Sequence, residues 1–424
     1  MRQPNLHADN GAVARKLANG VTVTMERLSH LRSAAAGVWV KTGSANETDM
    51  QSGISHFLEH LFFKGTARRS ARELVEAIES KGGQLNAFTS RDYTCVYVKT
   101  LDTHIGTGIE ILADIIKNSQ LCDLEKERNV VLEEIASIED VPEDHIHERL
   151  ARRLWPNHPL GRSVSGTIDS VKTLKLEDIR AYYTTWYRPQ NMYFSIAGNF
   201  DEEVVLNQVC MEFGDLAPGA AMERNGAPSF GNGVEVVGRD IAQAHICMGF
   251  PGPIANDPRR YVYDVLSNAL GGGSTSRLFE RIREDEGLAY AIYSFHAAHL
   301  TSGMLGVYAA VAPQNLEKTL DLIFHELQNF RDKSMSDAEL EMNREQLKGN
   351  MLMALENTFV RMSRMAKSMM YFGRVIPVEE VIKSVDAVST EDVQRLAHDT
   401  FVRERCALVA LGPCDGRIAE PLAL

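Results

Sequence analysis

The same order of strand-like and helix-like segments occurs twice in this chain, on either side of a stretch at 213–233 that is rich in Gly, Ala, Pro and Asn. Each half has strands, a helix and further strands, followed by another helix. In the first half these patterns lie at 20–28, 33–44, 70–83, 84–100 and 104–118. In the second half they lie at 233–252, 259–273, 288–311 and 316–330. The repeated order predicts duplication of one α+β unit.

The chain of 424 residues is too long for one ordinary core, which also favours two or more domains. We expect an N-terminal domain at 1–215, a linker at 216–233 and a homologous C-terminal domain at 234–424. Within the first of these, 123–187 is mostly helical and 192–200 has a strand pattern.

Composition and charge narrow the class of protein. The chain is 44% hydrophobic and 24% charged, as in a soluble globular protein, and its net charge is -12. This acidic balance argues against a nucleic-acid partner or an anionic membrane surface. No run of 18 apolar residues predicts a membrane-spanning helix, and the start lacks a secretory signal. Six cysteines without a C-x-x-C pair suggest free thiols in a reducing compartment.

The segment GISHFLEHLFFKG at 53–65 has the spacing of a metal site. Residues four apart on a helix face the same way, so His56 and His60 can share one ion, with Glu59 beside them. Two imidazoles and a carboxylate suit zinc with one position open for water, which a glutamate base can then deprotonate. The alternative is an amphipathic helix that carries polar residues. Its apolar residues imply burial, and a shared metal removes most of the cost of burying the polar groups.

A third ligand is expected from the helical stretch DLEKERNVVLEEIASIED at 123–140. At about 100° per residue, Glu127 lies roughly 40° and Glu134 roughly 60° from the centre of the apolar stripe. Glu133 points nearly the opposite way and should lie in solvent. The alternative is an ordinary solvated Glu-rich face.

Together these segments resemble the pitrilysin and mitochondrial processing peptidase family, whose His-x-x-Glu-His motif inverts the zincin motif. GGQLNAFTSRDYTCVYV, KERNVVLEEI, HPLGRSVSGT and ALGGGSTSRLFERIREDEGLAYAIYS follow in the family's order. The resemblance runs from about residue 12 to 412. It is strongest to the β-subunit type of processing peptidase and its bacterial homologues.

The resemblance implies a role for each matching residue. His56, His60 and Glu134 would bind one Zn²⁺ per chain, Glu59 would be the general base, and Glu127 would lie beside a ligand. In the second half, Arg283 and Tyr290 would reach the active site, where the tyrosine hydroxyl could stabilise the oxyanion. The alternative is a purely structural role, with the arginine at the surface and the tyrosine in the core.

The segment QLNAFTS matches an edge strand along which substrate pairs, and our candidates for contact are Asn86, Ala87 and Phe88. Phe88 is equally compatible with a plain core aromatic. LGGGSTSRLF lacks the ending of a phosphate loop and reads as a turn before a helix. We assign no role to His145, His147 or His158.

The family fold implies two similar α/β sandwich domains, each with an antiparallel-rich sheet, that form one half of a clam-shaped chamber. A second chain, either identical or an inactive relative, would complete the dimer. We therefore expect a zinc metalloendopeptidase acting on extended peptides or unfolded segments. Its expected location is the bacterial cytoplasm, or the mitochondrial matrix if a transit peptide has been removed. A non-catalytic scaffold subunit is disfavoured because all four motif residues are present, and a closed structural zinc site lacks a fourth ligand.

Overall fold

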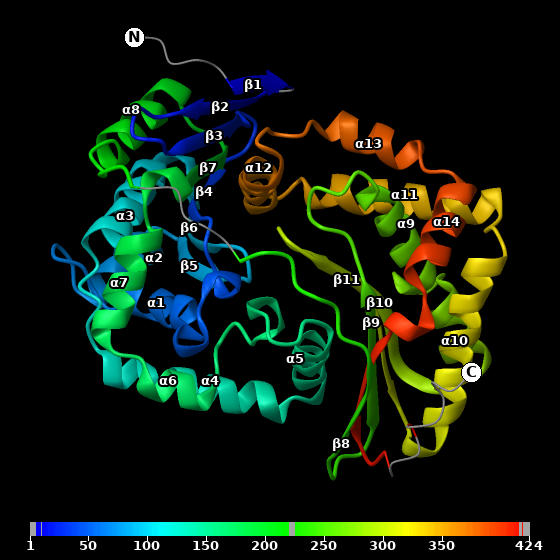
Figure 1. Ribbon diagram of the computed structural model, residues 1–424. Coiled ribbons are helices and arrows are strands. Elements are labelled where there is room, and N and C mark those ends of the chain that lie inside the picture. Colours follow the sequence, from blue (N-terminus) through cyan, green and yellow to red (C-terminus); the bar gives the residue numbers. More distant parts are fainter. Residues whose placement is uncertain (1–5, 10, 220–224, 415–417, 419–424) are drawn as a thin grey trace. The chain divides into compact units, whose positions relative to one another are not determined.

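The computed structural model describes residues 6–9, 11–219, 225–414 and 418, which fold into two compact units (Figure 1). The first unit holds the described residues of Met1–Ile135, Ser163–Asn225 and Leu352–Pro377. The second holds those of Ala136–Arg162, Gly226–Met351 and Val378–Leu424. Each unit has its own sheet and its own hydrophobic core.

The sheet of the first unit has seven strands in the order β1-β2-β3-β7-β4-β6-β5. The strands are β1 (Leu6–Asp9), β2 (Ala12–Lys16), β3 (Thr22–Arg27), β4 (Ser33–Val40), β5 (Gln84–Thr89), β6 (Thr94–Leu101) and β7 (Met192–Gly198). Only β3 and β7 pair in parallel, and every other neighbouring pair is antiparallel.

The sheet of the second unit has five strands in the order β10-β11-β9-β12-β8. The strands are β8 (Gly233–Gly238), β9 (Ala244–Pro251), β10 (Ala289–Ala298), β11 (Gly303–Val311) and β12 (Ala407–Gly412). Here β8 and β12 form the parallel pair, and the other pairs are antiparallel. Read from its parallel edge, this sheet repeats the order and directions of β3-β7-β4-β6-β5. The α+β class with two similar sheet units is therefore confirmed.

Helices cover both sheets. The first unit contains α1 (Ile54–Phe62), α2 (Ala71–Glu79), α3 (Ile105–Asn118), most of α4 (Leu124–Asp140), α6 (Ile168–Thr173), α7 (Leu176–Trp186), α8 (Glu202–Phe213) and α12 (Thr358–Phe372). The second contains α5 (Pro142–Leu154), α9 (Arg260–Gly271), the π-helix η6 (Phe279–Asp285), α10 (Leu316–Asp332), most of α11 (Asp337–Ala354), α13 (Val378–Asp386) and α14 (Thr390–Thr400). Within the described residues, no helix has both the length and the apolar character needed to cross a membrane.

Strand β4 shows why the first sheet needs helices on both faces. Its side chains alternate between faces, as in any strand, yet nearly all of them are buried. One set, which includes Ala36 and Val38, joins the core formed with α1, α3 and α7. The other set includes Trp39 and packs against Met362 and Met365 of α12.

Helix α5 has the corresponding place on the second sheet, where it packs against β9 and β12. Gly249 of β9 makes room for it, because a Cβ atom at this position would come within 3.2 Å of the Leu150 side chain. Met248 and Phe250 point to the opposite face, into the core with α9, α10 and α14.

These two helices change the expected domain division. A boundary at 216–233 assigns α5 to the N-terminal half and α12 to the C-terminal half, but each packs on the sheet built by the other half. Amphipathic periodicity reveals that a helix has a face to bury, not which sheet receives it. Part of the expected linker, 220–224, lies outside the described residues, and β8 begins at Gly233.

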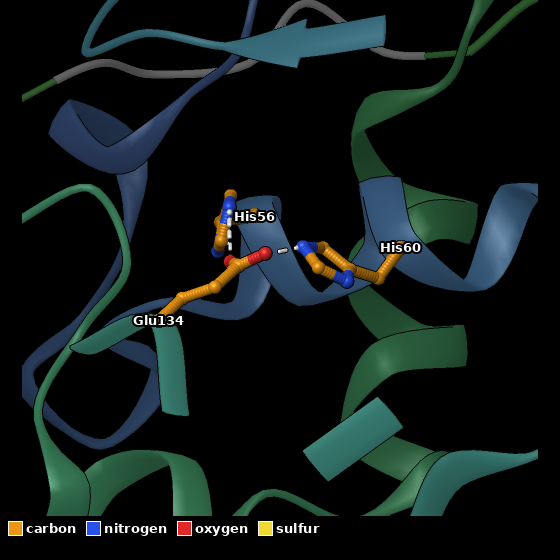
Figure 2. A group of neighbouring side chains, drawn as sticks. All are labelled: His56, His60 and Glu134. Carbon is orange, nitrogen blue, oxygen red and sulfur yellow. Dashed lines mark ion pairs between the residues drawn. The ribbon is translucent and has the colours of Figure 1, made fainter. Parts of the chain in front are cut away.

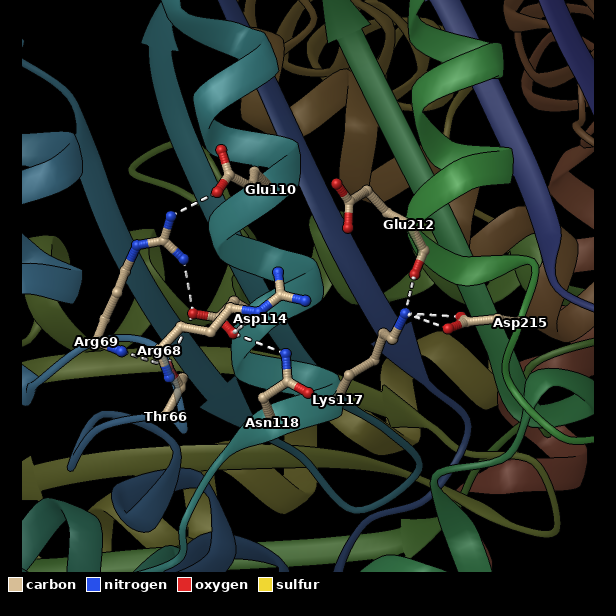
Figure 3. A network of polar contacts seen from close by, with 9 residues as sticks. All are labelled: Thr66, Arg68, Arg69, Glu110, Asp114, Lys117, Asn118, Glu212 and Asp215. Atoms are coloured by element: carbon tan, nitrogen blue, oxygen red, sulfur yellow. Dashed lines mark hydrogen bonds and ion pairs between the residues drawn. The ribbon is translucent and has the colours of Figure 1, made fainter.

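A polar network fastens the segment that follows α1 to the middle of α3 (Figure 3). The buried carboxylate of Asp114 accepts hydrogen bonds from Thr66 at 2.8 Å, Arg69 at 2.7 Å and Asn118 at 2.8 Å. Burial alone would raise the pKa of Asp114, but these bonds outweigh it and lower the pKa. Further along α3, Lys117 pairs with Asp215 at 2.6 Å. Charged groups buried in this unit thus have partners, as their desolvation requires.

The packing of α12 leads to a stability prediction. Met365→Ala removes a side chain that is 1% exposed against the first sheet, and it should destabilise the protein by about 2–5 kcal/mol. Met353→Ala is the matched control, because that methionine is 65% exposed and should change stability by no more than about 0.5 kcal/mol. Urea unfolding followed by tryptophan fluorescence measures both. Equal midpoints for the two variants would show that α12 does not cover this sheet in solution.

Candidate metal centre and active site

Helix α1 carries the His-x-x-Glu-His segment, and its start is held firmly. Gly53, at the N-cap, has φ 89°, and a Cβ there would lie 2.6 Å from the Ser165 carbonyl oxygen. The buried carboxylate of Glu47 accepts the backbone N–H groups of Gly53 at 2.7 Å and Ser55 at 2.9 Å. A negative charge at a helix N-terminus stabilises the helix. The apolar face of α1 is fully buried, and this fixes how the helix is rotated.

Helix α4 brings Glu134 to this pair of histidines (Figure 2). The Glu134 Oε2 atom lies 3.6 Å from His56 Nε2 and 3.3 Å from His60 Nε2. The two imidazole rings are 4.7 Å apart between centroids. In the described part of the chain, these three residues form the one group of metal-binding type, with ligand atoms all within 4.8 Å of one another.

The spacing fits a zinc ion. Bonds of about 2.0–2.2 Å in a tetrahedral arrangement place ligand atoms roughly 3.3–3.6 Å apart. The two distances to Glu134 Oε2, 3.6 and 3.3 Å, lie in this range. A direct hydrogen bond is not a good alternative at 3.6 Å. Burial, followed by the charge of His60, lowers the pKa of His56 to about 4, so at neutral pH its imidazole is uncharged and can donate a lone pair.

Glu127 lies one helical heptad before Glu134 and is 2% exposed. Its Oε2 atom lies 3.4 Å from His60 Nδ1, the ring nitrogen that faces away from Glu134. Its Oε1 atom pairs with Lys64 Nζ at 2.8 Å. A carboxylate on the far nitrogen of a ligating histidine fixes the tautomer and the ring orientation. Lys64 offsets the charge of this buried group, and the sequence analysis did not single it out, although it lies in the same motif segment.

Glu59 is half-buried on α1, and its Oε2 atom accepts a hydrogen bond of 2.5 Å from the Thr89 hydroxyl at the end of β5. Burial raises the pKa of Glu59, and the bond from Thr89 opposes the shift. Thr89 lies within the QLNAFTS segment, but nothing in its residue type or spacing marked it as a partner of Glu59.

Strand β5 forms the edge of the first sheet and is paired only with β6 among the described strands. Asn86 is exposed and accepts the Ala87 N–H at 2.8 Å, while Ala87 is buried. Phe88 packs against Trp39, with ring centroids 5.4 Å apart, and against Tyr97 and Phe359. For Phe88 the geometry therefore favours the core alternative over substrate contact.

Arg283 and Tyr290 lie in the second unit, whereas the three metal-site residues lie in the first. The Arg283 guanidinium stacks over Phe279 within η6, 4.7 Å from the ring centroid. Tyr290 is on the edge strand β10 and is 75% exposed, so the core-tyrosine alternative is not supported. Of the unassigned histidines, His147 bonds Tyr293 at 2.9 Å and His158 bonds the Gly226 carbonyl at 3.0 Å, as structural residues do.

Comparisons with known proteins agree with this architecture. The domain described as Insulinase (Peptidase family M16) matches residues 22–168, and the Peptidase M16 inactive domain matches residues 173–347. The uncharacterized zinc protease YmxG of Bacillus subtilis is 38% identical over 397 residues, covering 93% of this chain and 97% of that one. An uncharacterized zinc protease of Streptomyces coelicolor is 37% identical over 418 residues, covering 96% and 90%.

A crystal structure of a protease from Helicobacter pylori superposes with a TM-score of 0.86 at 23% identity. It covers 94% of this chain and 99% of that chain, and at this identity the likeness shows the fold alone. The first matched domain includes all of His56, His60 and Glu134. By these matches over nearly its whole length, the chain belongs to peptidase family M16.

Proposed function

We propose that this chain is a zinc-dependent endopeptidase that cleaves extended peptides or unfolded segments. The observation that carries the proposal is the cluster of His56, His60 and Glu134, with Glu59 on the same helix. The two bacterial relatives are named uncharacterized zinc proteases, and these names support the same reaction class. The second matched domain is described as inactive. This agrees with the position of the candidate metal ligands, which among the described residues lie only in the first matched domain.

His56, His60 and Glu134 would hold the ion, and Glu127 would keep the His60 ring in place. When bound, zinc supplies Lewis acidity toward water and toward a peptide carbonyl. Glu59 then acts as the general base, because a half-buried carboxylate with a raised pKa accepts a proton more readily than an exposed one. The Thr89 hydroxyl holds one carboxylate oxygen, Oε2, and leaves Oε1 for the proton of the attacking water. Glu59 can later pass this proton to the leaving amine.

The open edge of β5 would bind the substrate. An extended peptide that adds to a sheet edge is held mainly by main-chain hydrogen bonds, so its sequence matters less than its conformation. Because Thr89 is the last residue of β5, its bond to Glu59 ties the general base to the strand that would receive the peptide. Folded proteins, whose backbones are already paired, should be poor substrates.

Arg283 and Tyr290 would complete the site from the second unit, with the tyrosine hydroxyl donating to the oxyanion of the tetrahedral intermediate. A second chain, identical or related, would supply the other half of a chamber. The dimer, the chamber and the cytoplasmic location stay predictions.

Glu59→Gln tests the general base. The amide cannot accept a proton, while His56, His60 and Glu134 are unchanged. Turnover of an unfolded peptide should fall by about two to four orders of magnitude, with zinc content near that of the parent protein. Peptide cleavage kinetics and metal analysis of the same preparation measure the two effects. Near-normal turnover in the zinc-loaded variant would refute the assignment. A zinc-loaded parent protein that cleaves no peptide would instead favour the non-catalytic scaffold.

Glu134→Gln and Glu133→Gln form a matched pair on α4. Glu133 is exposed, whereas Glu134 contacts both histidines. Changing a residue that hydrogen-bonds to a metal ligand typically costs about 10–100-fold in metal affinity, and loss of Glu134, a ligand itself, should cost at least that much. Glu133→Gln should leave affinity unchanged. Competition with a chromophoric chelator measures both, and equal zinc affinity would mean that Glu134 is not a ligand.

Tyr290→Phe isolates the proposed oxyanion donor. The ring is 75% exposed, so loss of its hydroxyl should leave the melting temperature and zinc content unchanged. Turnover should fall by about 10²–10³ if the hydroxyl donates in the transition state. Steady-state kinetics should show this loss in kcat, since the bond forms as charge develops. Unchanged kcat would remove Tyr290 from the mechanism.

A further inference from the structure

A cavity of about 560 Å³ lies in the second unit, whereas the residues of the metal site belong to the first. Its walls come from α10, the end of β9 and the segment that follows α14. A volume of this size is typical of a site for a small organic ligand. None of the residues proposed for catalysis lines it.

Two guanidinium groups that line this cavity have no hydrogen bond or ion pair among the described residues. The Nε–H groups of Arg331 and Arg403 are buried, and neither has an acceptor among the described residues. Buried donors of this kind are rare, and each needs an explanation. Arg277 of the same unit is paired in the usual way, because its guanidinium group forms a bidentate ion pair with Glu339 at 2.7 and 2.8 Å. In Figure 3, Arg69 is likewise paired with Asp114, and Lys117 with Asp215.

Three phenylalanines form most of the apolar wall of the cavity. Phe250 and Phe401 are almost completely buried and pack edge to face, with centroids 5.3 Å apart. Phe324 adds a third ring, and the Arg403 guanidinium lies 5.0 Å from its centroid. Such an apolar surface can hold an apolar side chain. The contact with the Phe324 ring restricts the orientation of the Arg403 guanidinium group.

The acidic groups of the cavity, Asp321 and Glu404, belong to exposed residues, and in the described part of the chain neither forms an ion pair with Arg331 or Arg403. The two arginines and the two exposed carboxylates are therefore separate features of the lining. A ligand carboxylate would meet the arginines, whose planar forks match its two oxygens. An ammonium or an amide N–H of the same ligand would meet the acidic groups.

We propose that this cavity binds an apolar amino-acid residue through its free α-carboxylate, with its side chain against the phenylalanines. The carboxylate pairs with the guanidinium groups of Arg331 and Arg403, which have no ion pair of their own among the described residues. A free amino acid and the C-terminal residue of a peptide share this chemistry. The proposal does not depend on the metal site or on proteolysis.

Isothermal titration of the full chain tests this with three probes: L-phenylalanine, N-acetyl-L-phenylalanine and L-phenylalaninamide. A carboxylate probe should bind one to one and bind at least about tenfold more tightly than the amide, which lacks the carboxylate. Binding should persist in the presence of a metal chelator, which separates this site from the metal centre. Tighter binding of the free amino acid would identify free amino acids as the source, and tighter binding of the acetyl form would identify peptide C-termini.

Arg403→Gln should lower the affinity for the preferred carboxylate probe by at least about tenfold. Arg331→Lys keeps the positive charge but loses the planar guanidinium group, and it should also lower this affinity. Arg405→Gln is the control, because Arg405 is exposed and does not line the cavity. Three results would overturn the proposal: equal affinity for the amide, no binding of either carboxylate probe at 10 mM (about 2.7 kcal/mol of affinity), or equal losses in the Arg403 and Arg405 variants.

Discussion

Ile54, Phe57, Leu58, Leu61 and Phe62 of α1 are completely buried in the core of the first unit, and this contact orients the rest of the site. Each such side chain contributes about 1.5–3 kcal/mol on burial, so rotation of the helix about its axis would be costly. With the apolar face fixed, His56, Glu59 and His60 can project only from the opposite side. The burial of Val131 and Ile135 fixes α4 in the same way and directs Glu134 toward the histidines.

The same burial brings polar groups into a region of low polarity, and each is met by a specific partner. Glu47 receives two backbone N–H groups, Glu127 pairs with Lys64, and Glu59 accepts from Thr89. His56 is the exception, since its Nδ1 atom is buried without a partner among the described residues. The lowered pKa of His56 keeps the ring neutral, which limits the cost of leaving that nitrogen alone.

Periodicity in the sequence was enough to predict the duplicated α+β order, the helix with the two histidines and the contrast between Glu134 and Glu133, because each depends on local geometry along one element. Periodicity does not predict contacts between segments that are distant in the sequence. The partners Thr89 and Lys64, and the packing of Phe88 on Trp39, depend on how the strands of the sheet pair with one another and on where the helices lie against them. The patterns described above predict no element between residues 331 and 412, and this segment supplies α11 to α14 and β12.

The exchange of α5 and α12 between the two halves has a consequence for synthesis on the ribosome. The first sheet has all its strands once Gly198 has emerged, but the helix that covers Trp39 and its neighbours ends at Phe372. At about 5–20 residues per second, the intervening stretch of roughly 170 residues takes roughly 9–35 s to translate. During that interval the nascent chain carries an uncovered apolar sheet face that its own later sequence will cover. Completion of the first unit is therefore tied to synthesis of nearly the whole chain, and a product truncated before α12 would leave this face of the sheet uncovered.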